Sequence, residues 1–191
     1  RLGHLYEKYP ELKIDLMLEE RVLDLPMREA DVAIRMKEPS QADLIRRRLM
    51  DVDMKLYASR DYLEKYGTPE TTDDLVNHRL ISHNSTSPQV SAGAEWTAPF
   101  LQANGKSVLT VNNYFGILQA VLHGLGIGAL PDYVTVDSPE LVRVLPNDSS
   151  RPIPVYLAYP EELRHSKRVA AFRDFVLEEI KDYRQKARET P

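Results

Sequence analysis

The stretch from Val108 to Val134 constrains the fold more than any other part of the sequence. An alternating run leads into a polar break at Asn112 and Asn113, and apolar residues then recur at helical spacing from Tyr114 onward. A glycine cluster and a short apolar run that ends at Pro131 come next. The order strand, helix, strand is that of a βαβ unit and predicts an α/β fold with a parallel sheet. Ligands bind such sheets where strands end and helices begin, so Asn112, Asn113 and Tyr114 are candidate ligand contacts.

The glycine cluster favours a structural role over a nucleotide-binding one. Gly124, Gly126 and Gly128 follow the helical segment and precede a strand. A phosphate-binding loop needs the opposite order, with a strand before the glycines and a helix after them. The pattern therefore predicts a tight helix-to-strand turn.

Composition excludes several classes of protein. With 42% hydrophobic and 28% charged residues the chain is globular rather than disordered, and no apolar run is long enough to span a bilayer. The net charge of -4 argues against binding of a nucleic-acid backbone by this chain alone. The chain has no cysteine, which excludes disulfides and thiol chemistry and fits a cytoplasmic protein.

Most other elements follow from hydrophobic periodicity. The spacing of Leu2, Leu5, Tyr6 and Tyr9 predicts a first helix, and Ser166 begins a long final helix. Ser59 and Thr72 are expected to cap two further helices, and residues 22–28 to form a short helical stretch. Strands are expected at residues 12–18, 31–35, 44–49, 54–58, 80–82, 141–145 and 155–159.

The region before the βαβ unit reads as a loop followed by a hairpin. Residues 83–93 are polar and rich in serine. The runs 95–101 and 106–111 flank Asn104-Gly105, a pair typical of β-hairpin turns. The sequence therefore predicts two antiparallel strands here.

The sequence suggests two points where the chain could cross from one subdomain to another, near Ala58-Ser59 and near residues 149–154. Two crossings mean that the middle of the chain is inserted into a domain made of its two ends. The predicted subdomains are residues 1–58 with 152–191, and residues 59–151.

Several motifs, taken together and in order, are similar to those of one bacterial family, the effector-binding domains of LysR-type transcriptional regulators. The match extends over nearly the whole chain. It rests on the segments Arg28–Arg35, Leu56–Leu63, Gly67–Pro69, Asp74–His78, Gly124–Pro131, Tyr159–Pro160 and Phe172–Phe175.

The resemblance implies two α/β subdomains of the periplasmic-binding-protein type, joined by two crossing strands, with a small-molecule effector in the cleft between them. It also implies an N-terminal winged helix-turn-helix that binds promoter DNA and is expected to be missing from this chain. The family's first strand and the start of its first helix are expected to be missing too. The peroxide-sensing branch of the family is excluded because it uses cysteines.

Two groups of residues are candidate effector contacts, each with a plainer alternative. Asn112, Asn113 and Tyr114 could contact a ligand, cap a helix, or do both. Arg35 and Met36 follow a predicted strand, where the Arg35 guanidinium could pair with an effector carboxylate. The alternative for Arg35 is a salt bridge with a nearby acidic residue, either Asp31 or Glu38.

Other candidates follow strand ends in the same way. For Ser59 the sequence favours the role of helix cap over that of ligand contact. His83 and Asn84 follow the strand at 80–82 and could face the cleft or lie in a surface loop. Pro131 ends the last strand of the βαβ unit and completes the expected effector site.

The sequence offers no catalytic, metal or cofactor motif. The five histidines show neither H-x-x-x-H nor H-E-x-x-H spacing, and there is no G-x-S-x-G motif. The run Arg46 to Arg48 would alternate between the faces of a strand, so a solvated edge or dimer rim is favoured over a nucleic-acid patch. The chain is therefore not expected to be an enzyme.

The function expected from the sequence is that of the effector-sensing and dimerisation domain of a transcriptional regulator, with an anionic metabolite as effector. A free-standing solute-binding protein of a transport system would share the fold and is the alternative. A homodimer is expected in which the first helix packs against the helix around residues 114–123 of the partner, and a tetramer is left open for the full-length protein. Promoter DNA is expected to bind through the missing domain, and no membrane is expected as a partner.

Overall fold

The computed structural model describes residues 1–18, 24–84, 92–104, 107–135, 138–148 and 150–189. Contacts divide the chain into two compact units. Unit 1 comprises Arg1–Met17, Leu23–Met50 and Pro154–Pro191, and unit 2 comprises Leu18–Val22 and Asp51–Ile153. The boundaries near residues 50 and 153 fall inside two strands, β2 (Leu44–Val52) and β8 (Ile153–Pro160), which therefore connect the units. The first boundary lies eight residues before the one expected from the sequence, because β3 (Met54–Ser59) belongs to the sheet of unit 2.

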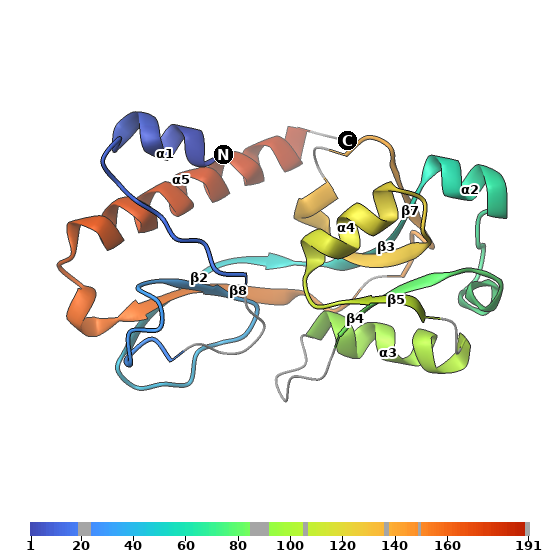
Figure 1. Cartoon of the computed structure of the whole chain (residues 1–191), viewed down its shortest axis with the longest axis horizontal. Coiled ribbons are helices and arrows are strands. Elements are labelled where there is room, and N and C mark those ends of the chain that lie inside the picture. The colour runs from blue at the N-terminus through green and yellow to red at the C-terminus, as the bar shows by residue number, and fades with distance from the viewer. Residues whose placement is uncertain (19–23, 85–91, 105–106, 136–137, 149, 190–191) are drawn as a thin grey trace. The chain divides into compact units, whose positions relative to one another are not determined.

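Unit 1 is built on a three-stranded sheet in the order β1-β8-β2. The short β1 (Ala33–Arg35) pairs antiparallel with β8, with Ile34 opposite Leu157. The helix α1 (Leu2–Lys8) and the long α5 (Lys167–Glu189) lie side by side in this unit (Figure 1), and a short 3-10 turn, η3 (Glu161–Leu163), precedes α5. Both helices were predicted, and the Ser166 hydroxyl accepts a hydrogen bond from the Val169 backbone N–H at 3.4 Å.

Unit 2 contains a five-stranded sheet in the order β5-β4-β6-β3-β7. The strands β4 and β5 are parallel, as are β4 and β6, whereas β3 runs antiparallel to both β6 and β7. Helices connect or follow these strands. The bounds are β4 (Leu80–His83), β5 (Ser107–Val111), β6 (Ile127–Pro131), β7 (Leu141–Val144), α2 (Arg60–Tyr66), η1 (Thr72–Asn77), α3 (Ala92–Asn104), α4 (Tyr114–Leu122) and η2 (Asp132–Thr135).

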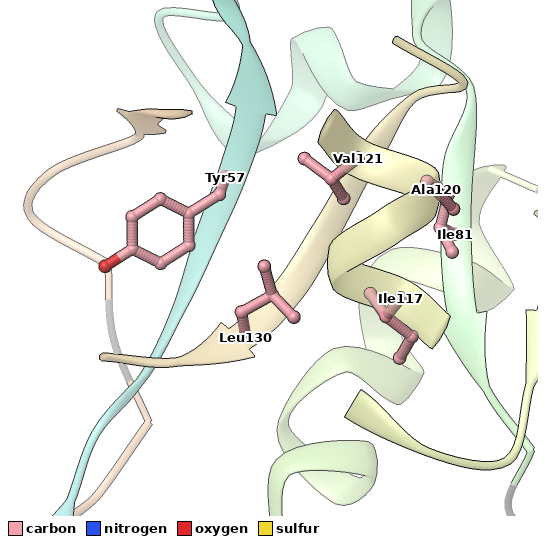
Figure 2. Packing of buried hydrophobic residues seen from close by; sticks show 6 residues of the cluster. All are labelled: Tyr57, Ile81, Ile117, Ala120, Val121 and Leu130. Carbon is pink, nitrogen blue, oxygen red and sulfur yellow. The ribbon is translucent and has the colours of Figure 1, made fainter. Parts of the chain in front are cut away.

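The predicted βαβ unit is confirmed as β5, α4 and β6, with β4 inserted between its two strands. The inner face of α4 packs on the sheet, and Figure 2 shows its side chains beside Ile81 of β4 and Leu130 of β6. Each large side chain removed from water in this way contributes roughly 1.5–3 kcal/mol, so this cluster holds α4 against the sheet. The cluster consists of Tyr57, Ile81, Ile117, Ala120, Val121 and Leu130.

The glycine turn after α4 is structural, as the order of elements predicted. Gly124 has a φ of +68°, a backbone conformation that favours glycine at a helix C-terminus. A Cβ on Gly126 would clash with the carbonyl oxygen of Arg79, which also accepts a hydrogen bond from the Ile127 backbone N–H at 2.8 Å. The turn can therefore dock on the backbone before β4 because position 126 has no side chain.

The cap of α2 was predicted correctly and that of the next helix was misplaced by one residue. The Ser59 hydroxyl accepts a hydrogen bond from the Tyr62 backbone N–H at 3.3 Å, and Gly67 follows the helix. For η1 the N-cap is Thr71 and not Thr72, because the Asp74 carboxylate folds back to accept the Thr71 backbone N–H at 2.8 Å.

The strand expected at residues 12–18 is absent, because this segment has no regular secondary structure. Its alternation of apolar residues does not bury one face, since Leu16 is 68% exposed. Alternation produces a strand where a neighbouring strand supplies hydrogen bonds, and no strand among the described residues pairs with this segment. The helical stretch expected at 22–28 is also wrong for the described residues 25–28, which form turns and include Arg28 at a φ of +62°.

The predicted hairpin is wrong as well, since residues 92–104 form α3. Parallel strands need a long crossover connection, and α3 provides part of it between β4 and β5. Trp96 and Phe100 lie one helical turn apart with their ring centroids 5.6 Å from each other, although Pro99 lies inside the helix. Gly105, the key residue of the hairpin signal, is outside the described residues.

Candidate functional site

The carboxyl ends of three parallel strands meet at one edge of the sheet of unit 2. These strands end at His83, Val111 and Pro131. Beyond its strand, the Asn84 backbone N–H donates to the Val111 carbonyl oxygen at 2.8 Å, which ties the two neighbouring ends together. The edge therefore gathers the candidates His83, Asn84 and Pro131 with those at the start of α4.

The start of α4 lies at this edge and is held by its own cap. The Asn113 side-chain oxygen accepts a hydrogen bond from the Gly116 backbone N–H at 2.7 Å. The Asn113 side-chain nitrogen donates to the side-chain oxygen of Asn112 at 3.1 Å. The capping interpretation of Asn113 is thus confirmed, and its oxygen is committed to the helix. The first turn of a helix carries a partial positive charge, which favours an anion beside it.

A pair of rings joins the end of β4 to the start of α4. The ring centroids of His83 and Tyr114 lie 4.9 Å apart with 31° between their planes. Tyr114 also packs against the core cluster behind α4. These contacts orient the first turn of α4 on the strand ends.

Pro131 is buried at the same edge and lies opposite Met54 of β3. The next residue is a feature that the sequence analysis missed. Asp132 lies 3.5 Å from the Nζ of Lys55, measured from its Oδ2, and its backbone N–H donates to the Asp53 carbonyl oxygen at 3.0 Å. Its position directly after Pro131 is the signal that would have identified it.

Ser59 does not belong to this group. Because β3 runs antiparallel to β6, its carboxyl end lies at the opposite edge of the sheet from Pro131. The Ser59 side chain is buried and caps α2. Its neighbour across space is Gly124, at the far end of α4 from Asn113.

Arg35 and Met36 lie in unit 1, at and just beyond the end of β1, and both are half-buried. Burial lowers the pKa of the Arg35 guanidinium, and the nearby charge of Asp24 opposes this shift. Of the two acidic residues expected as alternative partners, Asp31 and Glu38, Glu38 lies 3.7 Å from Arg46, measured from Oε1 to Nε. Asp24 is thus one acidic residue whose charge acts on Arg35.

Within the described ranges, no group of three or more His, Asp or Glu side chains is placed to hold a metal ion. Across the same ranges, none of the helices combines the length and the apolar character needed to cross a bilayer.

Comparison with known proteins gives a consistent picture. The family model of the LysR substrate binding domain matches residues 1–181. The chain is 28% identical over 183 residues to the HTH-type transcriptional regulator CrgA of Neisseria meningitidis serogroup B, a match that covers 91% of this chain and 59% of that one. It is 28% identical over 194 residues to the uncharacterized regulator YhjC of Escherichia coli, covering 96% and 63% respectively.

Among solved structures, the regulatory domain of CrgA superposes with a TM-score of 0.77 at 26% identity, covering 93% of this chain and 89% of that one. The expected α/β architecture of two subdomains is thus confirmed. The relatives are transcriptional regulators, which decides against the transport alternative. The chain spans about six tenths of the length of these regulators.

Proposed function

The chain belongs to the LysR substrate-binding domain family, and on this premise we propose that it binds a small anionic metabolite at the carboxyl edge of the unit 2 sheet. The domain is the effector-binding part of a LysR-type transcriptional regulator. The observation that most supports an anionic effector is the position of the first turn of α4. This turn is capped by Asn113 and lies at the same edge as the strand ends.

Two physical features support an anion there, and one opposes it. The helix start supplies positive potential and backbone N–H donors of the kind that hold carboxylates. The side chains of His83, Asn84 and Asn112 add hydrogen-bonding groups at the same edge. Asp132 works against an anion, and its ion pair with Lys55 offsets part of this charge.

Arg35 and Met36 remain predicted effector contacts on the other unit. A guanidinium can hold a carboxylate through two parallel hydrogen bonds, so Arg35 would favour an effector with a second acidic group. This part of the proposal depends on the sequence and the family, and substitution of Arg35 tests it.

A thermal-shift series of matched acids and amides tests the proposed class. The acids are acetate, succinate and benzoate, and the neutral controls are acetamide, succinamide and benzamide. We expect at least one acid to raise the Tm more than its amide does, because a ligand that binds the folded state stabilises it. We expect Arg35→Ala to reduce the shift given by succinate more than that given by acetate. Stabilisation by the amides and not by the acids would contradict the proposal.

We also propose that the domain forms a homodimer. Residues 107–122, which span β5 and α4, contain no charged residue, and Phe115 and Val108 are 63% and 51% exposed. A helix that is apolar all round is normally covered on both faces, and charged residues are depleted at the centres of interfaces. Exposed apolar side chains also occur on and after α1, at Tyr6, Tyr9 and Leu16. In a two-fold dimer, α1 of each copy would pack against α4 of the partner.

Another part of the regulator would bind DNA. The relatives are named HTH-type regulators, and this chain matches about six tenths of their length. Promoter binding by a winged helix-turn-helix elsewhere in the protein, and action in the cytoplasm, therefore belong to the proposal for the whole regulator.

A further inference from the structure

Four residues lie at the edge of the unit 2 sheet where β4 begins, opposite the edge proposed to bind the effector. Lys65 and Tyr66 belong to the last turn of α2, Arg79 directly precedes β4, and Leu125 lies in the turn after α4. Tyr66 and Leu125 are 44% and 43% exposed. We call these four residues the amino-edge patch. The patch combines two cations with exposed apolar surface.

The Tyr66 ring lies close to both cations. Its centroid is 4.7 Å from the Cζ of Arg79 and 5.3 Å from the Nζ of Lys65. The same guanidinium lies 5.5 Å from the ring centroid of Tyr62, and its Nη2 donates to the Gly124 carbonyl oxygen at 3.4 Å. Because two rings and the backbone already hold the Arg79 side chain in place, binding to a ligand would order this side chain little further.

Neither cation pairs with an acidic side chain in the described part of the protein. The Nε of Arg79 is buried and has no hydrogen-bond partner among the same residues. An aromatic ring attracts a cation through its face, but the N–H donors of a guanidinium lie in its own plane and still need acceptors. The exposed Glu64, next to Lys65 in the sequence, opposes an acidic ligand but forms no ion pair with either cation. Two neighbouring cations without a carboxylate therefore favour an acidic ligand from outside the chain.

We propose that the amino-edge patch binds an acidic segment of a partner protein. Carboxylates of the segment would pair with Lys65 and Arg79, and an apolar side chain between them would cover Tyr66 and Leu125. Tyrosine and arginine are among the residues that contribute most to protein interfaces. The exposure of the patch favours a protein over a small acid, because small ligands bind in concave sites that bury most of their surface.

The proposal is independent of the proposed effector site and of the proposed dimer. All four residues belong to unit 2, so the patch needs no contribution from the other unit. The patch lies at the opposite end of α4 from Asn113 and Phe115. An acidic segment could therefore bind while the effector edge and the start of α4 are occupied.

Fluorescence polarisation of labelled probes, titrated with the 191-residue chain, tests the proposal. The first probe is a short peptide in which each leucine is flanked by glutamates, and the second has glutamine in place of every glutamate. We expect the glutamate peptide to bind at least fivefold more tightly, because only its carboxylates form charge-assisted hydrogen bonds with a guanidinium. A single-stranded DNA of similar charge is the third probe, and we expect it to bind more weakly than the glutamate peptide.

Two exposed positions locate the binding site without disturbing the packing of Arg79. Lys65→Glu and Tyr66→Ala are each expected to weaken binding of the glutamate peptide at least fivefold. Lys167→Glu is the matched control, because it makes the same change of charge at an exposed position at the start of α5 in unit 1. We expect this control to change the Kd by less than twofold, and an unchanged Tm would show that each variant is folded.

Three results would overturn the proposal. In the first, the glutamate peptide binds no more tightly than the glutamine peptide. In the second, its affinity falls equally in Lys65→Glu and Lys167→Glu, which would mean that only the total charge of the chain matters. In the third, the DNA binds as tightly as the glutamate peptide and depends equally on Lys65, so that the patch would accept any polyanion.

Discussion

At the scale of single residues, the glycine turn makes a direct prediction. Gly126→Ala would push a methyl group into the Arg79 carbonyl oxygen, so the backbone must move. Overpacking of this kind typically costs about 1–3 kcal/mol. Gly3→Ala is a matched control, because it lies in α1 and its new methyl group would meet nothing within 4 Å. In urea, the free energy of unfolding should fall for Gly126→Ala and should not fall for Gly3→Ala. Equal stability of the two variants would show that the close approach of Gly126 to Arg79 does not matter for stability.

A buried histidine makes the stability of the domain depend on pH. His78 Nδ1 lies 3.2 Å from the Tyr62 hydroxyl, which accepts the Arg79 backbone N–H at 3.0 Å. Burial lowers the pKa of His78 below its ordinary value of 6.5, and the charge of Asp74 opposes this. The unfolded chain then binds the proton more readily, so the stabilising contribution is present above about pH 6.5 and is lost as the pH falls below it.

The free energy of unfolding in urea is therefore expected to fall between pH 7.5 and pH 5.5, and His78→Gln should reduce that fall. A variant that keeps the full pH dependence of the original chain would show that another group is responsible.

At the scale of elements, the cap of α4 has two roles that substitution can separate. Asn113→Ala removes the hydrogen bond to the Gly116 backbone N–H and is expected to cost about 1 kcal/mol of stability. Asn113→Asp keeps a capping oxygen, but it places a negative charge where the acid is proposed to bind. Unfolding and thermal-shift measurements should therefore show that the Asp variant is as stable as the original chain and binds acids poorly. Undiminished acid binding by this variant would argue against the site.

Some of the helices and strands could be predicted from the sequence and others could not. The βαβ unit was predictable because its helix, its glycine turn and its short strands carry local signals that agree with each other. The absence of a strand at residues 12–18 was not predictable, since alternation indicates a possible buried face but not whether a neighbouring strand exists. The helix α3 was missed because a turn dipeptide outweighed the one-turn spacing of Trp96 and Phe100, while the parallel pairing of β4 with β5 is non-local information.

At the scale of the whole molecule, strand direction decided which candidate residues come together. Asn112, Asn113 and Tyr114 were placed at a strand end by the parallel-sheet argument, and the structure brings them to one edge with His83, Asn84 and Pro131. Ser59 also follows a strand, but β3 is antiparallel to β6, and the sequence carries no signal for that direction. The ion pair of Asp132 with Lys55 could not be predicted, because it depends on the register between β3 and β6.

An NMR titration tests most directly whether an acid binds at the start of α4. The 191-residue chain, labelled with ¹⁵N and assigned, would be titrated with succinate and separately with succinamide. We expect the amide signals of residues 112–116 and of His83 and Asn84 to shift with succinate in a saturable manner. The reason is that the acid would accept hydrogen bonds from this turn and change the electrostatic field at its backbone amides. We expect no matching shifts with succinamide. Saturable shifts confined to other parts of the chain, or the same shifts with the neutral amide, would contradict the account.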